Sequence, residues 1–290
     1  MIPGIRGRHT ARVPSSPGTT RVRTIGLRRL LLRWAACWAV ALGTLTPPLS
    51  GAAAGPRPQI AIIIDDLGAS FDSGRRAIEL PGPVACAFLP YAPHTASLAH
   101  LAHTRHKEVM LHLPMQAVEG ATLEPGGLTL DMTQQQVVRT ILEDLNRVPH
   151  VSGLNNHMGS LLTRHPGHMS WLMEVLRGRQ DLFFVDSRTT RQTVAQRLAD
   201  EKGIPAVSRD VFLDYHTGQE SIEAQFLRLL KLARKNGYAL AIGHPHPTTL
   251  EVLTRELGRL DDHGVKLVPV SRLVQHHQER KSQWQVSLSR

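Results

Sequence analysis

The stretch IAIIIDDLG, Ile60–Gly68, decides the fold class of this chain. Its five leading residues are all apolar, without the polar alternation of a half-exposed strand. Such a run is typical of a strand covered on both faces, as in a parallel sheet. It ends abruptly in Asp65 and Asp66 before a Leu-Gly turn. The segment therefore predicts a buried parallel strand that presents carboxylates at its carboxyl end.

The same organisation repeats almost to the end of the chain, with apolar runs alternating with helical patterns and no break large enough for a second domain. The predicted strands are Ile60–Ile64, Val84–Leu89, Glu108–Leu111, Val151–Leu154, Leu182–Val185, Ala206–Leu213, Tyr238–Ile242 and Lys266–Val270. The predicted helices are Phe71–Leu80, Thr95–Thr104, Thr133–Arg147, Pro166–Arg177, Thr193–Lys202, Ser221–Lys235 and Thr248–Leu260. Repeated strand–helix units predict an α/β fold with a parallel sheet, either a barrel or a doubly wound layer.

Residues 1–54 have the composition of a targeting segment. They contain eight arginines and no acidic residue, then an apolar run from Trp34 to Leu45, then small residues up to Ala54. This order is typical of a secretory signal, and the apolar run is shorter than the roughly 20 residues of a membrane span. The alternative is an uncleaved N-terminal anchor, which would be the chain's only membrane attachment. Residues 55–58 are predicted to be a linker, residues 59–274 the folded body and residues 275–290 a polar tail.

The charge and the cysteines agree with export. The formal net charge is +10, but without the eight leader arginines the 34 basic residues fall to 26, against 24 acidic residues. The body thus has no electrostatic footprint for nucleic acid. Only Cys37 and Cys86 are present, and Cys37 lies in the leader, so no intramolecular disulfide is expected in the body. We expect an exported protein, periplasmic or otherwise extracytoplasmic.

Polar residues follow directly after most of the predicted strands. In chain order they are Asp65 and Asp66, His112, Asn155, Asn156 and His157, Asp186, Asp214, and His244 with His246 nearby. The carboxyl ends of parallel strands meet on one face, and that face carries the active site in α/β folds. Any one of these residues could cap a helix or be a hydrogen-bonded core group, but their joint placement predicts a functional site.

The first two strand ends favour metal or acid–base chemistry. Two adjacent carboxylates, Asp65 and Asp66, repel each other in a partly buried site unless a cation or a proton intervenes. His112, at the end of a buried strand, could be a structural histidine or a ligand. One aspartate with two histidines is a set suited to zinc with an open position for water. A carboxylate left free beside that water could act as a general base.

The later strand ends offer further candidates. His157, in the loop after Asn155 and Asn156, could be a metal ligand or a catalytic group, and the two amides could donate to a substrate oxygen. His244 lies between Gly243 and Pro245, a rigid turn that suits a general acid or a ligand. His246 could as easily be solvent-exposed. Asp186 could orient one of the histidines, pair with Arg188 or cap a helix.

Five ordered motifs resemble the divergent polysaccharide deacetylases, relatives of the NodB-homology deacetylases. The motifs are IAIIIDDLG (Ile60–Gly68), EVMLHLPMQ (Glu108–Gln116), GLNNHMGS (Gly153–Ser160), FFVDSRTT (Phe183–Thr190) and AIGHPHPTTLEVL (Ala241–Leu253). The resemblance covers roughly residues 59–274. It implies a single distorted, TIM-like (β/α) barrel of seven or eight parallel strands.

The resemblance also implies roles. Asp65 matches the family's catalytic base, Asp66 its metal aspartate, His112 the first histidine of the H-x-x-x-H metal motif, and His244 the general acid. The sequence departs from the pattern at Gln116, where the second metal histidine would stand, and it lacks the usual arginine-proline-tyrosine motif. From strand order we infer that His157 supplies the missing ligand.

These residues lead to two expectations about function. The first is a metal-dependent hydrolase, with zinc or a similar divalent ion, that removes acetyl groups from an envelope glycan. The second is a glycan-binding or division-related envelope factor that keeps the barrel without turnover, an alternative motivated by Gln116. Hydrolysis of another envelope bond is a third. Aromatic content is only 4%, and Tyr91 is the best candidate for stacking against a sugar.

Overall fold

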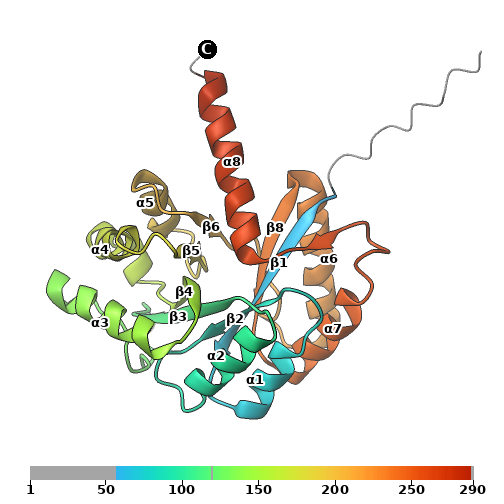
Figure 1. Ribbon diagram of the computed structural model, residues 1–290, viewed down its shortest axis with the longest axis horizontal. Helices are drawn as coiled ribbons and strands as arrows, with labels where there is room; N and C mark the ends of the chain where they lie inside the picture. The colour runs from blue at the N-terminus through green and yellow to red at the C-terminus, as the bar shows by residue number, and fades with distance from the viewer. Residues whose placement is uncertain (1–56, 119, 289–290) are drawn as a thin grey trace, which may run out of the picture. The chain divides into compact units, whose positions relative to one another are not determined.

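The computed structural model describes residues 57–118 and 120–288. The predicted targeting segment, residues 1–54, and the start of the linker lie outside this range. Among the described residues, no helix is both long and apolar enough to cross a membrane. The described part of the chain forms one curved sheet with helices packed against it (Figure 1).

The sheet is built from parallel strands in the order β6-β5-β4-β3-β2-β1-β8-β7, and the short β9 also pairs with β1. The strands are β1 (Gln59–Leu67), β2 (Ala85–Phe88), β3 (Val109–Met115), β4 (Val151–Met158), β5 (Phe183–Asp186), β6 (Ala206–Ser208), β7 (Val211–Phe212), β8 (Tyr238–Gly243) and β9 (Lys266–Leu267). The helices are α1 (Phe71–Ile78), α2 (Thr95–Thr104), α3 (Gln134–Arg147), α4 (Pro166–Arg177), α5 (Ala195–Glu201), α6 (Gln219–Asn236), α7 (Pro247–Leu257) and α8 (Val270–Leu288), with a 3₁₀ turn, η1, at Leu162–Arg164.

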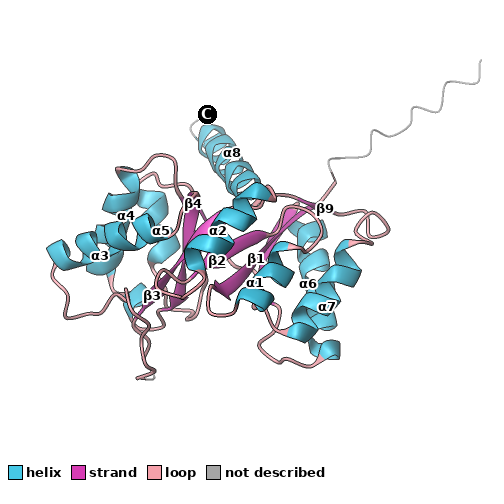
Figure 2. Ribbon diagram, turned by 60° about the horizontal axis from the view of Figure 1, so that its bottom comes forward, coloured by secondary structure: helices cyan, strands magenta, loops and turns pink. Residues whose placement is uncertain are grey.

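Alternation along β1 separates two apolar layers. Ile60, Ile62 and Ile64 belong to the large core that also contains buried residues of helices α1 to α7. Ala61 and Ile63 belong to a second core in which the other members come from strands, from Val268 and from the start of α8. All seven earlier helices therefore cover the same, outer face of the sheet, as Figure 2 shows. This arrangement distinguishes a barrel from a doubly wound layer, so the barrel prediction is confirmed.

The barrel is left open between β6 and β7, where the sequence predicted one continuous strand. Arg209 and Asp210 separate the two short strands, and their backbone N–H groups donate to strands on opposite sides. Arg209 donates to the carbonyl of Asp186 on β5, and Asp210 donates to the carbonyl of Leu240 on β8, at 3.0 and 2.9 Å. The same stretch of chain therefore borders β5 through β6 and β8 through β7.

The end of the chain also differs from the prediction. The strand expected over Lys266–Val270 is only two residues long, and the described part of the expected polar tail, residues 275–288, is the continuation of α8. Val270, Leu273 and Val274 of α8 fill the amino end of the barrel interior. The carboxylate of Glu108 accepts the backbone N–H groups of Val270 and Ser271, which fixes the helix start. Figure 1 shows the rest of α8 extending past the strands.

The two ends of the barrel therefore have different tasks. The start of α8 closes the amino end with apolar side chains, and the polar residues that follow the strands gather at the carboxyl end. Every strand pair is parallel, so all the strand ends singled out in the sequence lie on that one face.

Candidate active site

An irregularity at the end of β1 brings two consecutive aspartates to the same face. Neighbouring residues of a strand normally point to opposite faces. Here the pairing with β2 shifts register between Ile64 and Leu67, and Asp66 has a φ of 56°, in the left-handed region. Aspartate tolerates this conformation better than most residues. Asp65 faces the barrel interior and is buried, and Asp66 reaches the same mouth and is partly exposed.

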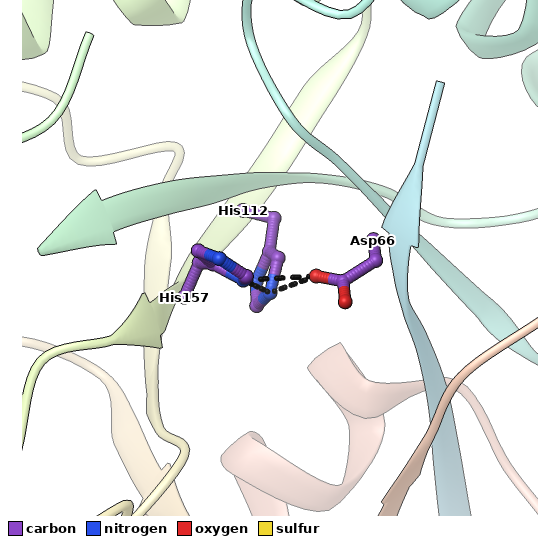
Figure 3. Close-up of side chains that lie close together, drawn as sticks. All are labelled: Asp66, His112 and His157. Carbon is purple, nitrogen blue, oxygen red and sulfur yellow. Dashed lines mark hydrogen bonds and ion pairs between the residues drawn. The ribbon is translucent and has the colours of Figure 1, made fainter. Parts of the chain in front are cut away.

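Asp66, His112 and His157 converge on one point from β1, β3 and β4 (Figure 3). Asp66 Oδ1 lies 3.1 Å from His112 Nε2 and 2.9 Å from His157 Nδ1. The two ring nitrogens are 3.1 Å apart. The parallel register of β3 and β4 places Asn155 beside His112 and Pro114 beside His157, so the two histidines are two positions apart along the strands and project from the same face.

Partners on the far side of each ring fix which nitrogen points inward. Asn155 donates through Nδ2 to both oxygens of Asp65, so its Oδ1 is left to accept the Nδ1–H of His112, at 2.9 Å. His112 then turns Nε2 toward Asp66. On His157 the carboxylate of Glu124 lies 3.1 Å from Nε2, outside hydrogen-bond geometry, and its charge favours a proton there, which leaves Nδ1 for the centre. Metal-binding histidines in proteins are held by such oxygen partners.

The electrostatics of this group are those of a cation site. Burial raises the pKa of Asp66, but the His112 and His157 rings outweigh it and hold the pKa of that carboxyl well below its usual range. Burial lowers the pKa of His112, but Asp65 and Asp66 raise it to about 9. Asp65 and Asp66 thus stabilise a positive charge at this point, and a proton on His112 is enough to supply it.

The donor set fits a divalent metal. Asp66 Oδ1 is buried and accepts no hydrogen bond from either ring, although both nitrogens are close. A buried carboxylate oxygen without a donor is costly unless a cation meets it. One carboxylate and two imidazoles are ligands that zinc and similar ions take, with positions left open for water and substrate.

Asp65 lies beside this group without belonging to it. Its Oδ2 is 3.6 Å from His112 Nε2, and its carboxylate accepts both contacts from Asn155 Nδ2, at 2.9 and 3.1 Å. Burial raises the pKa of Asp65, against the lowering effect of His112 and His244. A buried carboxylate with a raised pKa is well suited to accept a proton near neutral pH.

His244, on the opposite side of the mouth, is held by Asp214. The two residues follow the neighbouring strands β7 and β8, and His244 Nδ1 lies 2.9 Å from Asp214 Oδ1. Asp214 Oδ2 accepts the backbone N–H of His244 and the hydroxyl of Thr249, at 2.7 and 2.8 Å. Burial lowers the pKa of His244, but Asp214 outweighs it and raises that pKa. Its free Nε2 points toward the centre, 3.7 Å from Asp66 Oδ2.

The remaining predicted site residues have other positions. Asn156 ties β4 to β5: its Oδ1 accepts the backbone N–H of Ser187, and its Nδ2 donates to the carbonyl of Met158. Asp186 orients no histidine, because its oxygens accept from the Arg188 backbone and the Thr193 hydroxyl. His246 is exposed, with its ring 5.8 Å from that of His244.

Gln116 takes no part in the centre. Its side-chain oxygen accepts the backbone N–H of Leu130 at 2.8 Å, and this hydrogen bond anchors the loop after β3. Tyr91, the aromatic residue expected to stack against a sugar, is not among the residues that line the cavity at the mouth. Its ring lies under the Arg147 guanidinium, 3.8 Å from it. Phe212 and the exposed Tyr215 line it instead.

A cavity of about 780 Å³ opens over this site, lined by residues that follow β1, β3, β4, β5, β7 and β8 and by α6. Sequence reasoning missed three features of the site: Glu124 behind His157, the pairing of Asp214 with His244, and the arginines of the cavity wall. The pairing of Asp214 with His244 could have been found from strand order, because β7 and β8 are consecutive in sequence and their ends lie next to each other. No periodic signal marks Glu124, which lies in a loop.

Comparisons with known proteins agree with the geometry. The uncharacterized protein YibQ of Escherichia coli K12 is 36% identical over 251 residues, 87% of this chain and 75% of that protein. An uncharacterized protein of Haemophilus influenzae is 36% identical over 215 residues, 74% of this chain and 76% of its own. The crystal structure of uncharacterized protein ATU2773 from Agrobacterium tumefaciens C58 shares the fold, with a TM-score of 0.72 and 22% identity over 78% of this chain and 92% of that one.

The sequence profile of one family accounts for nearly all of the barrel. It matches residues 62–274, from Ile62 in β1 to Val274 near the start of α8. The match therefore includes every residue of the site. The chain belongs to the divergent polysaccharide deacetylase family.

Proposed function

We propose that this protein is a metal-dependent hydrolase that removes acyl groups, acetyl above all, from an envelope glycan. One observation carries the proposal: a three-donor centre, Asp66, His112 and His157, stands between a buried carboxylate and an Asp-held histidine. The family implies a carbohydrate substrate. A base on one side and an acid on the other are the two proton-transfer groups that acyl hydrolysis needs.

The metal would be held by Asp66 Oδ1, His112 Nε2 and His157 Nδ1. When bound there, a divalent ion such as zinc lowers the pKa of water and polarises an acyl oxygen. Asn155 and Glu124 keep the two ring lone pairs directed inward. These contacts pre-organise the ligands, because neither ring can turn without breaking a contact on its far side.

The protein's own groups carry the protons. Asp65 takes a proton from water as the water oxygen bonds to the acyl carbon. His244 gives its Nε2 proton to the sugar nitrogen or oxygen as the bond from that atom to the acyl carbon breaks. The products are the free acid and the sugar amine or alcohol. Asp214 holds Nδ1–H of His244, so the ring keeps its orientation through the transfer.

The proposal includes an extracytoplasmic location, supported by the arginine-rich leader and its following apolar run in residues 1–54. The rival is a binding protein that keeps the barrel without turnover. The binding protein is an alternative because Gln116 stands where the family's second metal-binding histidine would be. His157 completes a three-donor set from the next strand, and this favours the hydrolase.

Acetate release from acetylated glycans by the purified zinc-loaded protein, beside Asp65→Asn, tests the proposal. We expect release by the wild type, none by Asp65→Asn, and about one equivalent of metal in both by elemental analysis. Glycan binding without acetate release, unchanged in Asp65→Asn, would favour the binding protein. A wild type that stays metal-free when zinc is supplied would overturn the hydrolase mechanism.

A further inference from the structure

The wall of the cavity on the side of β5, β7 and α6 is rich in arginine. Arg188, Arg191, Arg209 and Arg228 all line it, against Asp65 and Asp210 among the lining residues. Asp65 faces the metal centre, so Asp210 is the one acidic residue on the arginine side. The described body as a whole has no comparable excess, because outside residues 1–54 the chain carries nearly balanced charge.

One of these arginines has a structural task. Arg209 donates to the carbonyl oxygens of Ser187 and Arg188, at 2.6 and 3.0 Å, and its guanidinium lies 4.9 Å from the Phe212 ring centroid. It therefore ties the loop after β5 to the turn that spans the open side of the barrel. Burial and the charge of Arg188 lower the pKa of Arg209, a sign of how closely these cations lie.

The other three arginines have no such task. Arg188 and Arg191 are exposed and make no side-chain hydrogen bond or ion pair with any described residue. Arg228 makes only a long contact, 3.4 Å, with Gln225. A surface arginine is usually explained by a nearby carboxylate or by solvation alone. Asp210 lies within electrostatic range of Arg188, Arg209 and Arg228, and Asp186 lies within range of Arg188, but neither carboxylate forms a close ion pair with them. The cavity wall therefore carries more arginines than nearby acids, and this excess needs another explanation.

The loop that carries Arg188 and Arg191 is held in place. Asp186 accepts the backbone N–H of Arg188 and the hydroxyl of Thr193, at 2.9 and 2.8 Å. Arg188 adopts a φ of 49°, in the left-handed region, which costs conformational energy in a residue with a side chain. Strain of this kind persists where the surroundings enforce it, so the loop presents its arginines in a defined direction.

Helix α6 supplies the facing wall. Ser221, Gln225 and Arg228 line the cavity at positions i, i+4 and i+7, which lie on the same face of a helix. The exposed Tyr215 stands at the same rim, with its ring 6.3 Å from that of Phe212. The cavity thus combines an aromatic face, hydrogen-bonding side chains and an excess of guanidinium groups in one lining with His244.

We propose that this site selects an anionic glycan, in which a carboxylate or phosphate close to the acylated sugar is bound by Arg188, Arg191 and Arg228. The inference rests on the proposed function for its glycan, and it adds the charge class of that glycan. The planar guanidinium fork matches the two oxygens of a carboxylate or phosphate, and its charge assists each hydrogen bond. Tyr215 offers a flat face for the adjoining sugar ring.

Direct binding tests the proposal without requiring turnover. Calorimetry of the full protein would compare three probes: neutral chitohexaose, hexagalacturonate for carboxylate and phosphomannopentaose for phosphate. The variant Arg188→Gln/Arg191→Gln removes two cavity charges. Its matched control, Arg139→Gln/Arg177→Gln, removes two exposed arginines from α3 and α4, outside the cavity. Thermal unfolding checks that both variants remain folded.

We expect at least one anionic probe to bind about tenfold or more tightly than chitohexaose, with the preference lost in the cavity variant and kept in the control. The probe that shows it identifies carboxylate or phosphate as the group. Equal binding of neutral and anionic probes, or no binding of either anion, would overturn the proposal. So would a preference that survives in the cavity variant but disappears with a chelator, since the metal would then be the anion's partner.

The outcome is separable from that of the proposed function. Acetate release from a neutral glycan with no anion preference would leave the hydrolase standing and overturn the arginine assignment. An arginine-dependent anion preference without acetate release from any glycan would support the arginine assignment and overturn the hydrolase.

Discussion

Two groups at the mouth of the barrel contain the same residue types and differ in chemistry. Asp66, His112 and His157 form one, and Asp214 with His244 forms the core of the other. In the first, the buried Asp66 Oδ1 accepts no hydrogen bond, and partners behind the histidines turn two ring nitrogens toward it. In the second, the carboxylate of Asp214 accepts three hydrogen bonds, two from His244 and one from Thr249.

The difference lies in where the protons are. A carboxylate oxygen that accepts no hydrogen bond, faced by two ring nitrogens that can exchange a proton for a metal, is suited to a cation. A carboxylate that already accepts three N–H and O–H donors holds its histidine protonated and keeps few lone-pair sites for a metal. His246 is near enough to count as a third ligand by distance, but the three donors on Asp214 disfavour a second metal there. The surroundings of each aspartate thus decide between a ligand and a proton-donor partner.

The comparison fails most clearly if Asp66 can be removed without loss of metal. For Asp66→Ala we expect loss of bound zinc and a fall in deacylation on the order of 10³-fold or more, because the lowered pKa of water depends on the metal. Elemental analysis and acetate release measure both. A chelator should reproduce the loss in the wild type, and added zinc should reverse it. Asp214→Asn is the control, and equal metal loss in that variant would contradict the division between the groups.

His244→Gln should leave the metal in place and remove the acid. General acid catalysis contributes about 10²–10⁴-fold, and we expect a loss of kcat in that range. Unchanged zinc content, measured on the same sample, separates this effect from a ligand loss. The loss should shrink with a substrate whose leaving group is a good one, such as an activated acetyl ester, because that group departs without a proton. An equal loss with both substrates would show that His244 does not donate the proton.

Asp214→Asn sharpens the comparison through pH. Asp214 raises the pKa of His244, which keeps the ring protonated and active as an acid; activity is present below that pKa and is lost as the pH rises through it. Without the carboxylate the pKa of His244 falls, so the alkaline loss of kcat should begin at lower pH. We also expect roughly 10- to 100-fold lower kcat at neutral pH, less than the full loss of a general acid. An alkaline limb that does not move would place the titrating group elsewhere.

The sequence could predict the sheet because each strand is buried on both faces and therefore continuously apolar. It could not divide Ala206–Leu213 into β6 and β7, since the division depends on hydrogen bonds from Arg209 and Asp210 to strands far away in the chain. It also missed α8, in which the residues of the barrel core, Val270, Leu273 and Val274, all lie at the start of the helix. The carboxylate that fixes that helix start, Glu108, is 162 residues earlier.

In the site, too, the positions of the residues could be predicted from the sequence and their roles could not. Asp65, Asp66, His112, His157 and His244 were predictable because the ends of parallel strands must meet. Their roles depend on details that no spacing encodes: the left-handed turn at Asp66, the amide of Asn155 between two side chains, and the partners of Asp214. Asp186 shows the limit, because a strand-end carboxylate can serve a loop instead of a histidine.

Glu124 gives the smallest expected effect and the finest test of the comparison. Its carboxylate faces His157 Nε2 at 3.1 Å and favours the tautomer with Nδ1 free. For Glu124→Gln we expect about tenfold weaker zinc binding, at the low end of the effect of such partners because the side chain is partly exposed. Competition with a chelating dye measures the affinity. Glu143→Gln, on the exposed surface of α3, is the control of equal charge change. If both variants weaken zinc equally, the effect is general electrostatics, and the inward lone pair of His157 does not depend on Glu124. If only Glu124→Gln does, then the partner behind the ring contributes to making this histidine a ligand, just as the carboxylate of Asp214 raises the pKa of His244.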